Sequence, residues 1–203
     1  MFSIEAPIWR TVKHLTVKPH YLLWQYLHGK RKTFYRPVSF FILTSALYLL
    51  VRWAINFDIL SDTSISVGNV GDGVMLTRAR NYMLLHIDKL LIFYVLSMAF
   101  LLKLFFYKRY SLAEYFAIAF FMVGFYMLLA TLNIVFITYS GSTNQSLALV
   151  VMGVYFVVTM MLFFKKPKFW IAIKAFFVYM FGATIYLLLA FGFSYLMVGI
   201  TRA

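Results

Sequence analysis

Residues 29–57 read GKRKTFYRPVSFFILTSALYLLVRWAINF. A basic segment here runs directly into about 20 mostly apolar residues, the length that an α-helix needs to cross roughly 30 Å of hydrocarbon. Pro37 stands at the start of the apolar part, where a helix best tolerates a missing backbone N–H. The stretch therefore predicts a membrane-spanning helix over residues 37–57, with basic residues before its first turn.

Four further apolar stretches follow this one. They predict spans over about residues 84–106, 112–139, 147–164 and 174–198. The fifth apolar stretch begins before residue 174, and Lys174 places its first turn in the membrane interface. Hydrophobic residues make up 64% of the chain and charged residues 12%, against roughly 45–50% and 25% in soluble domains. The predicted fold class is all-α, a polytopic membrane helix bundle of about five transmembrane helices.

The positive charges alternate between the segments that flank these spans. Of the 19 Lys and Arg residues, seven lie in residues 1–36, three in residues 103–109 and four in residues 165–174. The intervening segments hold few. Because Lys and Arg concentrate in cytoplasmic loops, this pattern predicts a cytoplasmic N-terminus and a C-terminus outside.

The first 36 residues form a segment of their own before the five-span domain of residues 37–203. Apolar residues recur at helical spacing on both sides of Pro19, which predicts two short amphipathic helices on the cytoplasmic face. Trp9, Trp24 and Tyr26 are expected at headgroup depth, and Gly29 is expected to end the second helix. Residues 58–82 are expected to form a long loop outside the membrane.

The net charge of +13 indicates an anionic partner. Nucleic acid is not expected, because the basic residues are divided among several membrane-flanking segments, which suits anionic lipid headgroups better. The densest group is Lys30, Arg31, Lys32 and Arg36. Two interpretations stay open: a topogenic signal that fixes orientation, or a specific site for a phosphate headgroup or an acidic protein partner.

Polar residues inside predicted spans are candidate functional residues. Glu114 follows Ser111 by three positions, which predicts a capping box, with a functional carboxylate as the alternative. Arg52 and Asp88 lie at similar depth and are expected to pair. The remaining candidates are His86, beside Asp88, and Asn133, which is expected to bond across helices or to its own backbone.

No constellation of catalytic residues is visible. The chain has no Cys, and its four His residues lack the spacing of metal ligands, so no metal site and no cofactor is expected. The nucleophile and phosphate-loop motifs are missing too. We expect a non-enzymatic accessory or scaffold protein with a protein partner or a second copy of itself. The alternatives are a small-solute permease or channel component and, less favoured, a membrane-embedded enzyme acting on lipid.

Residues 26–40 carry the pattern YxxGKRxxFxxPxSF, and residues 107–115 form a basic-aromatic turn followed by Glu114. The chain resembles a bacterial membrane-protein family of unknown function in both features. The resemblance implies a multi-pass protein of the bacterial inner membrane. Similar proteins often carry a Cys-rich zinc ribbon, which this chain lacks, and a His after the Glu, where this chain has Tyr115. Roles that depend on zinc or on a Glu-His pair therefore do not transfer.

Overall fold

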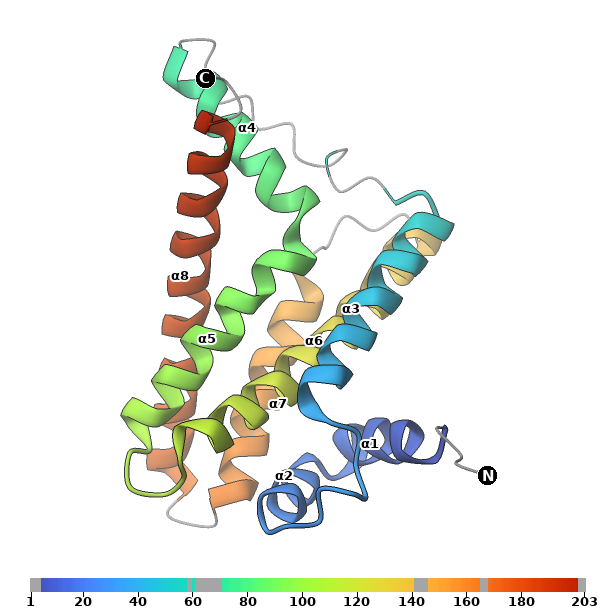
Figure 1. Ribbon diagram of the computed structural model, residues 1–203, viewed down its shortest axis with the longest axis vertical. Helices are drawn as coiled ribbons and strands as arrows, with labels where there is room; N and C mark the ends of the chain where they lie inside the picture. The colour runs from blue at the N-terminus through green and yellow to red at the C-terminus, as the bar shows by residue number, and fades with distance from the viewer. Residues whose placement is uncertain (1–4, 58–59, 61–70, 141–145, 165–167, 201–203) are drawn as a thin grey trace.

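The computed structural model describes residues 5–57, 60, 71–140, 146–164 and 168–200 (Figure 1). These residues form eight helices and no strand, which confirms the all-α fold class. In chain order the helices are α1 (Glu5–Val17), α2 (Pro19–Leu27), α3 (Pro37–Ala54), α4 (Gly71–Leu85), α5 (Ile87–Phe105), α6 (Leu112–Ser140), α7 (Leu147–Phe164) and α8 (Lys168–Ile200).

Four of the helices, α3, α6, α7 and α8, are each long and apolar enough to cross a membrane. The pair of α4 and α5 makes a fifth span if the two are counted together. The first span ends at Ala54 rather than at the predicted residue 57. Asn56 adopts a φ of 50°, a left-handed conformation that a continuing helix does not contain.

The predicted second span, residues 84–106, is wrong at its first end. Residues 84 and 85 belong to α4, and α4 meets α5 at an angle of 85°. Residues 71–82, expected to be part of a loop, are helical. Asp88 lies in the first turn of α5, where a carboxylate stabilises the start of a helix. Two glycines disfavour α4 intrinsically, and its packing along α8 outweighs that cost.

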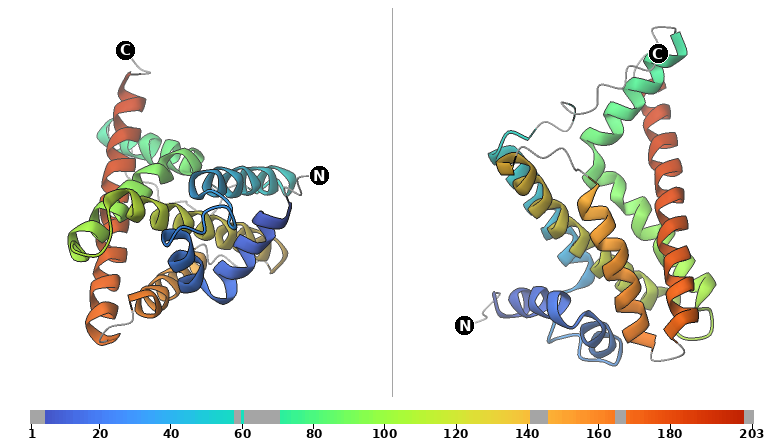
Figure 2. Two further views of the ribbon diagram at one scale, coloured as in Figure 1. Left: turned by 60° about the horizontal axis from the view of Figure 1, so that its bottom comes forward. Right: turned by 180° about the vertical axis from the view of Figure 1, so that it is seen from behind.

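The bundle is built on two close helix pairs, α3 with α6 and α5 with α8 (Figures 1 and 2). Helix α6 also packs against α5 and α7, so it forms the centre of the core. At the crossing of α3 and α6, a Cβ atom built on Gly124 would lie 2.7 Å from the Phe40 ring. The glycine thus permits a close approach that a larger residue would prevent.

Helix α8 has 33 residues, which corresponds to about 50 Å at 1.5 Å per residue. It extends the predicted span of residues 174–198 at both ends. Much of its surface is exposed and apolar, as is the outer surface of α7. Such faces suit contact with lipid.

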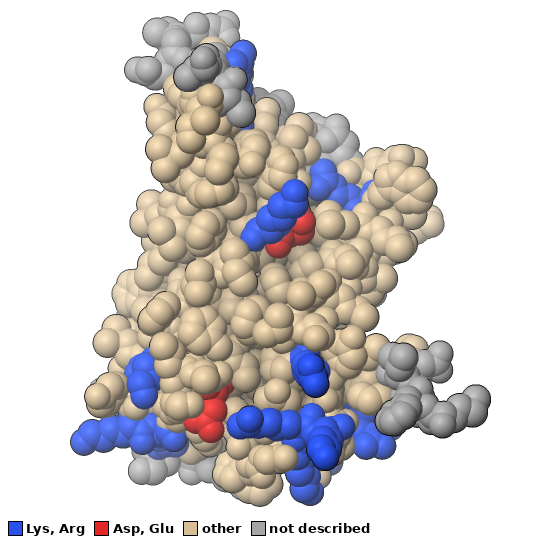
Figure 3. Space-filling model, viewed as in Figure 1, with Lys and Arg blue, Asp and Glu red and all other residues tan. Residues whose placement is uncertain are grey.

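Lys and Arg gather at one end of the molecule, the lower edge in Figure 3. We call this the basic end; it contains the cavity residues Arg31, Lys32 and Arg36 and, at the turns beside α5 and α8, Lys103, Lys108, Arg109 and Lys174. Lys165 and Lys166 lie outside the described residues. Exposed aromatic residues lie toward both ends of the spans, with Trp170 near the basic end and Trp53 and Tyr139 near the other. Aromatic residues at both ends are typical of helices that cross a bilayer.

Helices α1 and α2 pack against the bundle at the basic end (Figure 2). The Tyr155 hydroxyl of α7 donates a hydrogen bond of 2.6 Å to the Leu15 carbonyl of α1. The Tyr26 ring of α2 lies edge-on to Phe121 of α6, with ring centroids 5.2 Å apart. Of the three aromatic residues expected at headgroup depth, Tyr26 packs against the bundle, whereas Trp9 and Trp24 are exposed.

Candidate functional site

Helix α2 ends as the sequence predicts. Gly29 has a φ of 96°, and the Lys30 N–H donates to the Gln25 carbonyl at 3.1 Å. This is a Schellman closure, in which a left-handed glycine lets the next N–H reach back to the helix. It turns the chain sharply into the basic linker of residues 30–36.

Thr11 of α1 holds the linker in place, although no sequence pattern predicts this role. Thr11 is fully buried, and its hydroxyl accepts a 2.9 Å hydrogen bond from the Tyr35 N–H. The same hydroxyl donates to the Pro7 carbonyl at 2.7 Å. Thr11 therefore fixes the linker one residue before Arg36 and the start of α3.

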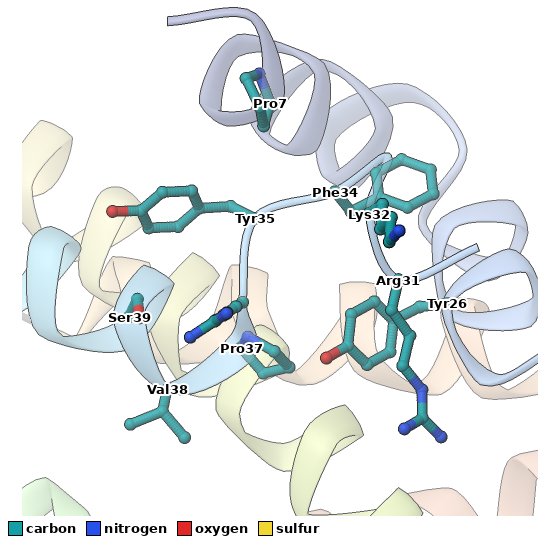
Figure 4. Close-up of a pocket in the computed structure, with 10 residues that line it drawn as sticks. Pro7, Tyr26, Arg31, Lys32, Phe34, Tyr35, Pro37, Val38 and Ser39 are labelled. Atoms are coloured by element: carbon teal, nitrogen blue, oxygen red, sulfur yellow. The ribbon is translucent and has the colours of Figure 1, made fainter. Parts of the chain in front are cut away.

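A cavity of about 940 Å³ lies between α1, α2, the linker and the start of α3 (Figure 4). Figure 4 shows the Tyr26 hydroxyl directed toward Pro37, with Pro7 on the far side of the linker. Helix α3 begins here without a side chain that caps its first N–H groups. The cavity is lined by Pro7, Tyr26, Arg31, Lys32, Phe34, Tyr35, Arg36, Pro37, Val38 and Ser39.

Three of the four predicted basic residues, Arg31, Lys32 and Arg36, line this cavity, whereas Lys30 does not. Among the residues that the structure describes, no carboxylate lines the cavity. Burial raises the pKa of the Tyr26 phenol above its ordinary value, against the lowering effect of Arg31 and Arg36. Tyr26 is therefore a neutral hydroxyl donor at neutral pH. The cavity combines positive charge with hydrogen-bond donors.

The basic residues on the other side of the basic end are used differently. Arg109 donates to the Phe164 carbonyl at the end of α7 at 3.1 Å. Lys103 donates to the carbonyls of Tyr107 and Tyr110 at 3.2 and 3.0 Å. Cations at helix C-termini offset the negative end of the helix dipole. These side chains stabilise helix ends.

Glu114 forms the predicted capping box. Its Oε2 accepts hydrogen bonds from the Ser111 N–H at 2.7 Å and the Ser111 hydroxyl at 2.9 Å. In return, the Glu114 N–H donates to the Ser111 hydroxyl oxygen at 3.3 Å. Both residues thus satisfy N–H groups at the start of α6, which supports the structural interpretation of the carboxylate.

Replacing Glu114 separates the structural interpretation from the functional one. Glu114→Gln keeps an oxygen that accepts the Ser111 bonds, so we expect stability close to that of the unchanged protein. Glu114→Ala removes the acceptor and should cost about 1 kcal/mol. Thermal unfolding in detergent measures both. Equal stability of the two variants would contradict the capping role.

The other polar candidates are not gathered into one site. Arg52 and Asp88 both lie within electrostatic reach of Tyr48, yet the described residues contain no ion pair between them, contrary to expectation. His86 occupies the break between α4 and α5, where its ring stacks on Tyr82 with centroids 4.2 Å apart. His86 and Asp88 thus lie at a helix break, and Arg52 lies in the last turn of α3.

Asn133 lies elsewhere in the bundle. Its side chain is buried, and the residue lines a small cleft of about 180 Å³ between α6 and α7. None of the residues that line the cavity beside the linker lines this cleft. The two sites are therefore separate.

Sequence reasoning missed most of the cavity's lining. The basic run and the pattern of residues 26–40 contain many of the lining residues, but neither showed that these residues meet around one cavity. Phe34, Tyr35 and Ser39 had no assigned role, because their meeting depends on how α1 packs on the linker. Thr11 gave no signal, since a threonine within an amphipathic helix is common on either face.

Comparison with known protein families gives a match to the N-terminal part of the chain. Residues 5–49 match a family described as protein of unknown function (DUF3667). The matched region contains α1, α2, the basic linker and most of α3, and it agrees with the resemblance to a family of unknown function. Neither the curated proteins nor the solved structures contain a match.

Proposed function

We propose that this protein is a non-enzymatic accessory or scaffold component of the bacterial inner membrane. The observation that carries the proposal is the exposed surface of α1. Its opposite face is fixed to α7 through Leu15 and to the linker through Thr11. The α1 outer surface, by contrast, presents a groove lined by Trp9, Arg10, Lys13, His14, Val17 and Lys18.

The composition of this surface suits a protein partner. Trp9 is 72% exposed and Val17 is 66% exposed, and both lie among basic side chains. Aromatic residues and Arg are enriched at protein interfaces. A rigidly held helix with such a mixed apolar and basic face is suited to recruiting another protein. Glu114 and Arg109, which could otherwise be considered for catalysis, have structural roles at helix ends.

The proposed orientation places the basic end in the cytoplasm. The α1 outer surface and the cavity would then face the cytoplasmic side, and the end of α8 would lie outside. The alternation of basic residues along the sequence supports this orientation.

Co-purification in mild detergent tests the scaffold function. The unchanged protein should retain a partner or self-associate, as measured by light scattering and mass spectrometry. Trp9→Ala with Val17→Ala should lose that association. Val154→Ala with Leu188→Ala is the control, because these residues are also exposed but lie in α7 and α8. A monomer without any partner, or equal loss in both variants, would contradict the proposal.

A permease is the second candidate, and one observation favours it. The phenol rings of Tyr94, Tyr179 and Tyr186 meet inside the bundle, with centroids of Tyr94 and Tyr186 5.6 Å apart. Tyr186 has a buried hydroxyl with no hydrogen-bond partner among the described residues. A row of internal hydroxyls suits passage of a small polar solute. Solute flux in proteoliposomes, abolished by Tyr186→Phe, would support this candidate over the scaffold.

A further inference from the structure

We propose that the cavity between α1, the basic linker and α3 binds the phosphate group of a membrane amphiphile. This binding site is independent of the scaffold surface on α1, because the two surfaces share no lining residue. The ligand is identified by its chemistry: an anionic phosphate attached to an apolar chain.

The positive charge of the cavity is suited to binding an anion. Arg31, Lys32 and Arg36 line one volume, and no carboxylate from the described part of the chain lines it with them. Elsewhere at the basic end, Lys103 and Arg109 are bound to backbone carbonyls. The described contacts of the three cavity cations include no such carbonyl and no ion pair. Their charge is therefore available to a ligand.

The donor set suits phosphate in particular. A guanidinium can bind two phosphate oxygens at once, and an ammonium adds a compact positive charge. The neutral Tyr26 hydroxyl supplies a further donor, and the Ser39 hydroxyl lines the same volume. The first turn of α3 adds its positive dipole end. Each of these groups is a donor or a positive charge of the kind that a phosphate oxygen accepts.

The remaining lining indicates an amphiphile. Pro7, Phe34, Pro37 and Val38 are apolar and share the cavity with the cations. Val38 is also 48% exposed on the outside of α3, at the beginning of a helix that is apolar enough to cross a membrane. Headgroups lie at this depth of a bilayer, so a lipid can place its phosphate in the cavity and its chain along α3.

The cavity is also held in place before any ligand arrives. The Thr11 bond to Tyr35 and the Gly29 turn fix both ends of the linker. A preorganised site spends little binding free energy on ordering the chain. This rigidity distinguishes the cavity from a flexible basic tail, which attracts any anionic surface.

Lipid titrations of the purified full-length protein test the proposal. The probes are phosphatidylglycerol and diacylglycerol with identical acyl chains, measured by native mass spectrometry. The unchanged protein should bind phosphatidylglycerol roughly 100 times more tightly than diacylglycerol, because only the former has a phosphate for the three cations to bind. The variant Arg31→Gln, Lys32→Gln, Arg36→Gln should lose roughly 100-fold of that affinity, since each cation contributes about 1 kcal/mol near an anionic lipid.

A matched variant controls for net charge. Arg10→Gln, Lys13→Gln, Lys18→Gln removes the same number of charges from the α1 outer surface, which is a different groove. It should change phosphatidylglycerol affinity less than about twofold. Equal losses in the two variants would show a general charge effect and overturn the proposal. Unchanged affinity in the cavity variant would overturn it as well, and would favour an acidic protein partner if such a partner were lost.

A second variant covers the case in which the cavity variant fails to insert into the membrane. Tyr26→Phe with Ser39→Ala keeps every charge and removes two hydroxyl donors. It should weaken phosphatidylglycerol binding about 30-fold, as expected for two lost hydrogen bonds of about 1 kcal/mol each; unchanged binding would contradict the proposal. Inorganic phosphate in the millimolar range should not displace the lipid. Displacement would assign the site to soluble phosphate and overturn the lipid source.

Discussion

The Gly124→Ala variant should unfold at a clearly lower temperature than the unchanged protein. The new Cβ would lie 2.7 and 2.9 Å from two carbons of the Phe40 ring and 3.4 Å from the Phe41 Cα. Phe40 is fully buried, so its ring has no free space to move into. Overpacking of this kind costs about 1–3 kcal/mol, more than the gain in helix propensity of up to about 1 kcal/mol.

Two further variants make this prediction specific. Gly192→Ala in α8 adds the same methyl group where no atom lies within 4 Å, so it should leave the unfolding temperature equal or higher. Phe40→Leu combined with Gly124→Ala should recover part of the lost stability, because the smaller side chain removes the clash. A Gly124→Ala variant as stable as Gly192→Ala would show that α3 and α6 do not meet at this glycine.

Labelling of single cysteines should give an all-or-none result for orientation. The chain has no Cys, so each introduced Cys is the only thiol. Ser66→Cys and Ser142→Cys should react with a membrane-impermeant thiol reagent in intact cells, or in spheroplasts. Thr33→Cys, in the basic linker, should not. Residues 66 and 142 lie outside the described part of the structure, and the expectation for them comes from the alternating charges.

Permeabilised cells supply the control for the labelling. All three cysteines should react once the reagent has access to both sides, apart from slower reaction at the half-buried Thr33 position. The reverse pattern, with Thr33→Cys labelled and the other two protected in intact cells, would contradict the proposed orientation. The orientation of the cavity and of the α1 outer surface would then be reversed with it.

Features that depend on a few neighbouring residues could be predicted from the sequence. The capping box of Ser111 and Glu114 involves a separation of three residues, and the Gly29 turn ends one short helix. The predicted span of residues 147–164 coincides with α7, because an uninterrupted apolar run has only one stable form in a membrane. In each case the chain near the feature contains its physical cause.

Features that depend on distant contacts could not be predicted. Helix α4 contains Gly71 and Gly73, which favour a loop locally, and it is stabilised by packing on α8. The Arg52 and Asp88 pair was inferred from depth alone, and depth does not specify which faces of two helices meet. The cavity also depends on a distant contact. Its basic residues could be identified from the sequence, whereas its shape depends on the contact of Thr11 with Tyr35.

The hydrogen bond from Tyr155 to Leu15 has a consequence for how the chain is synthesised. These residues are 140 positions apart, so α1 leaves the ribosome long before the helix that holds it exists. Phe121, whose ring contacts that of Tyr26, is also synthesised well after α2. We therefore expect the N-terminal helices to stay at the membrane surface, without their contacts to the bundle, until α6 and α7 have been inserted. In ribosome-bound chains that stop before α7, we expect α1 to be cleaved by added protease. In chains long enough to include α7, we expect α1 to be protected.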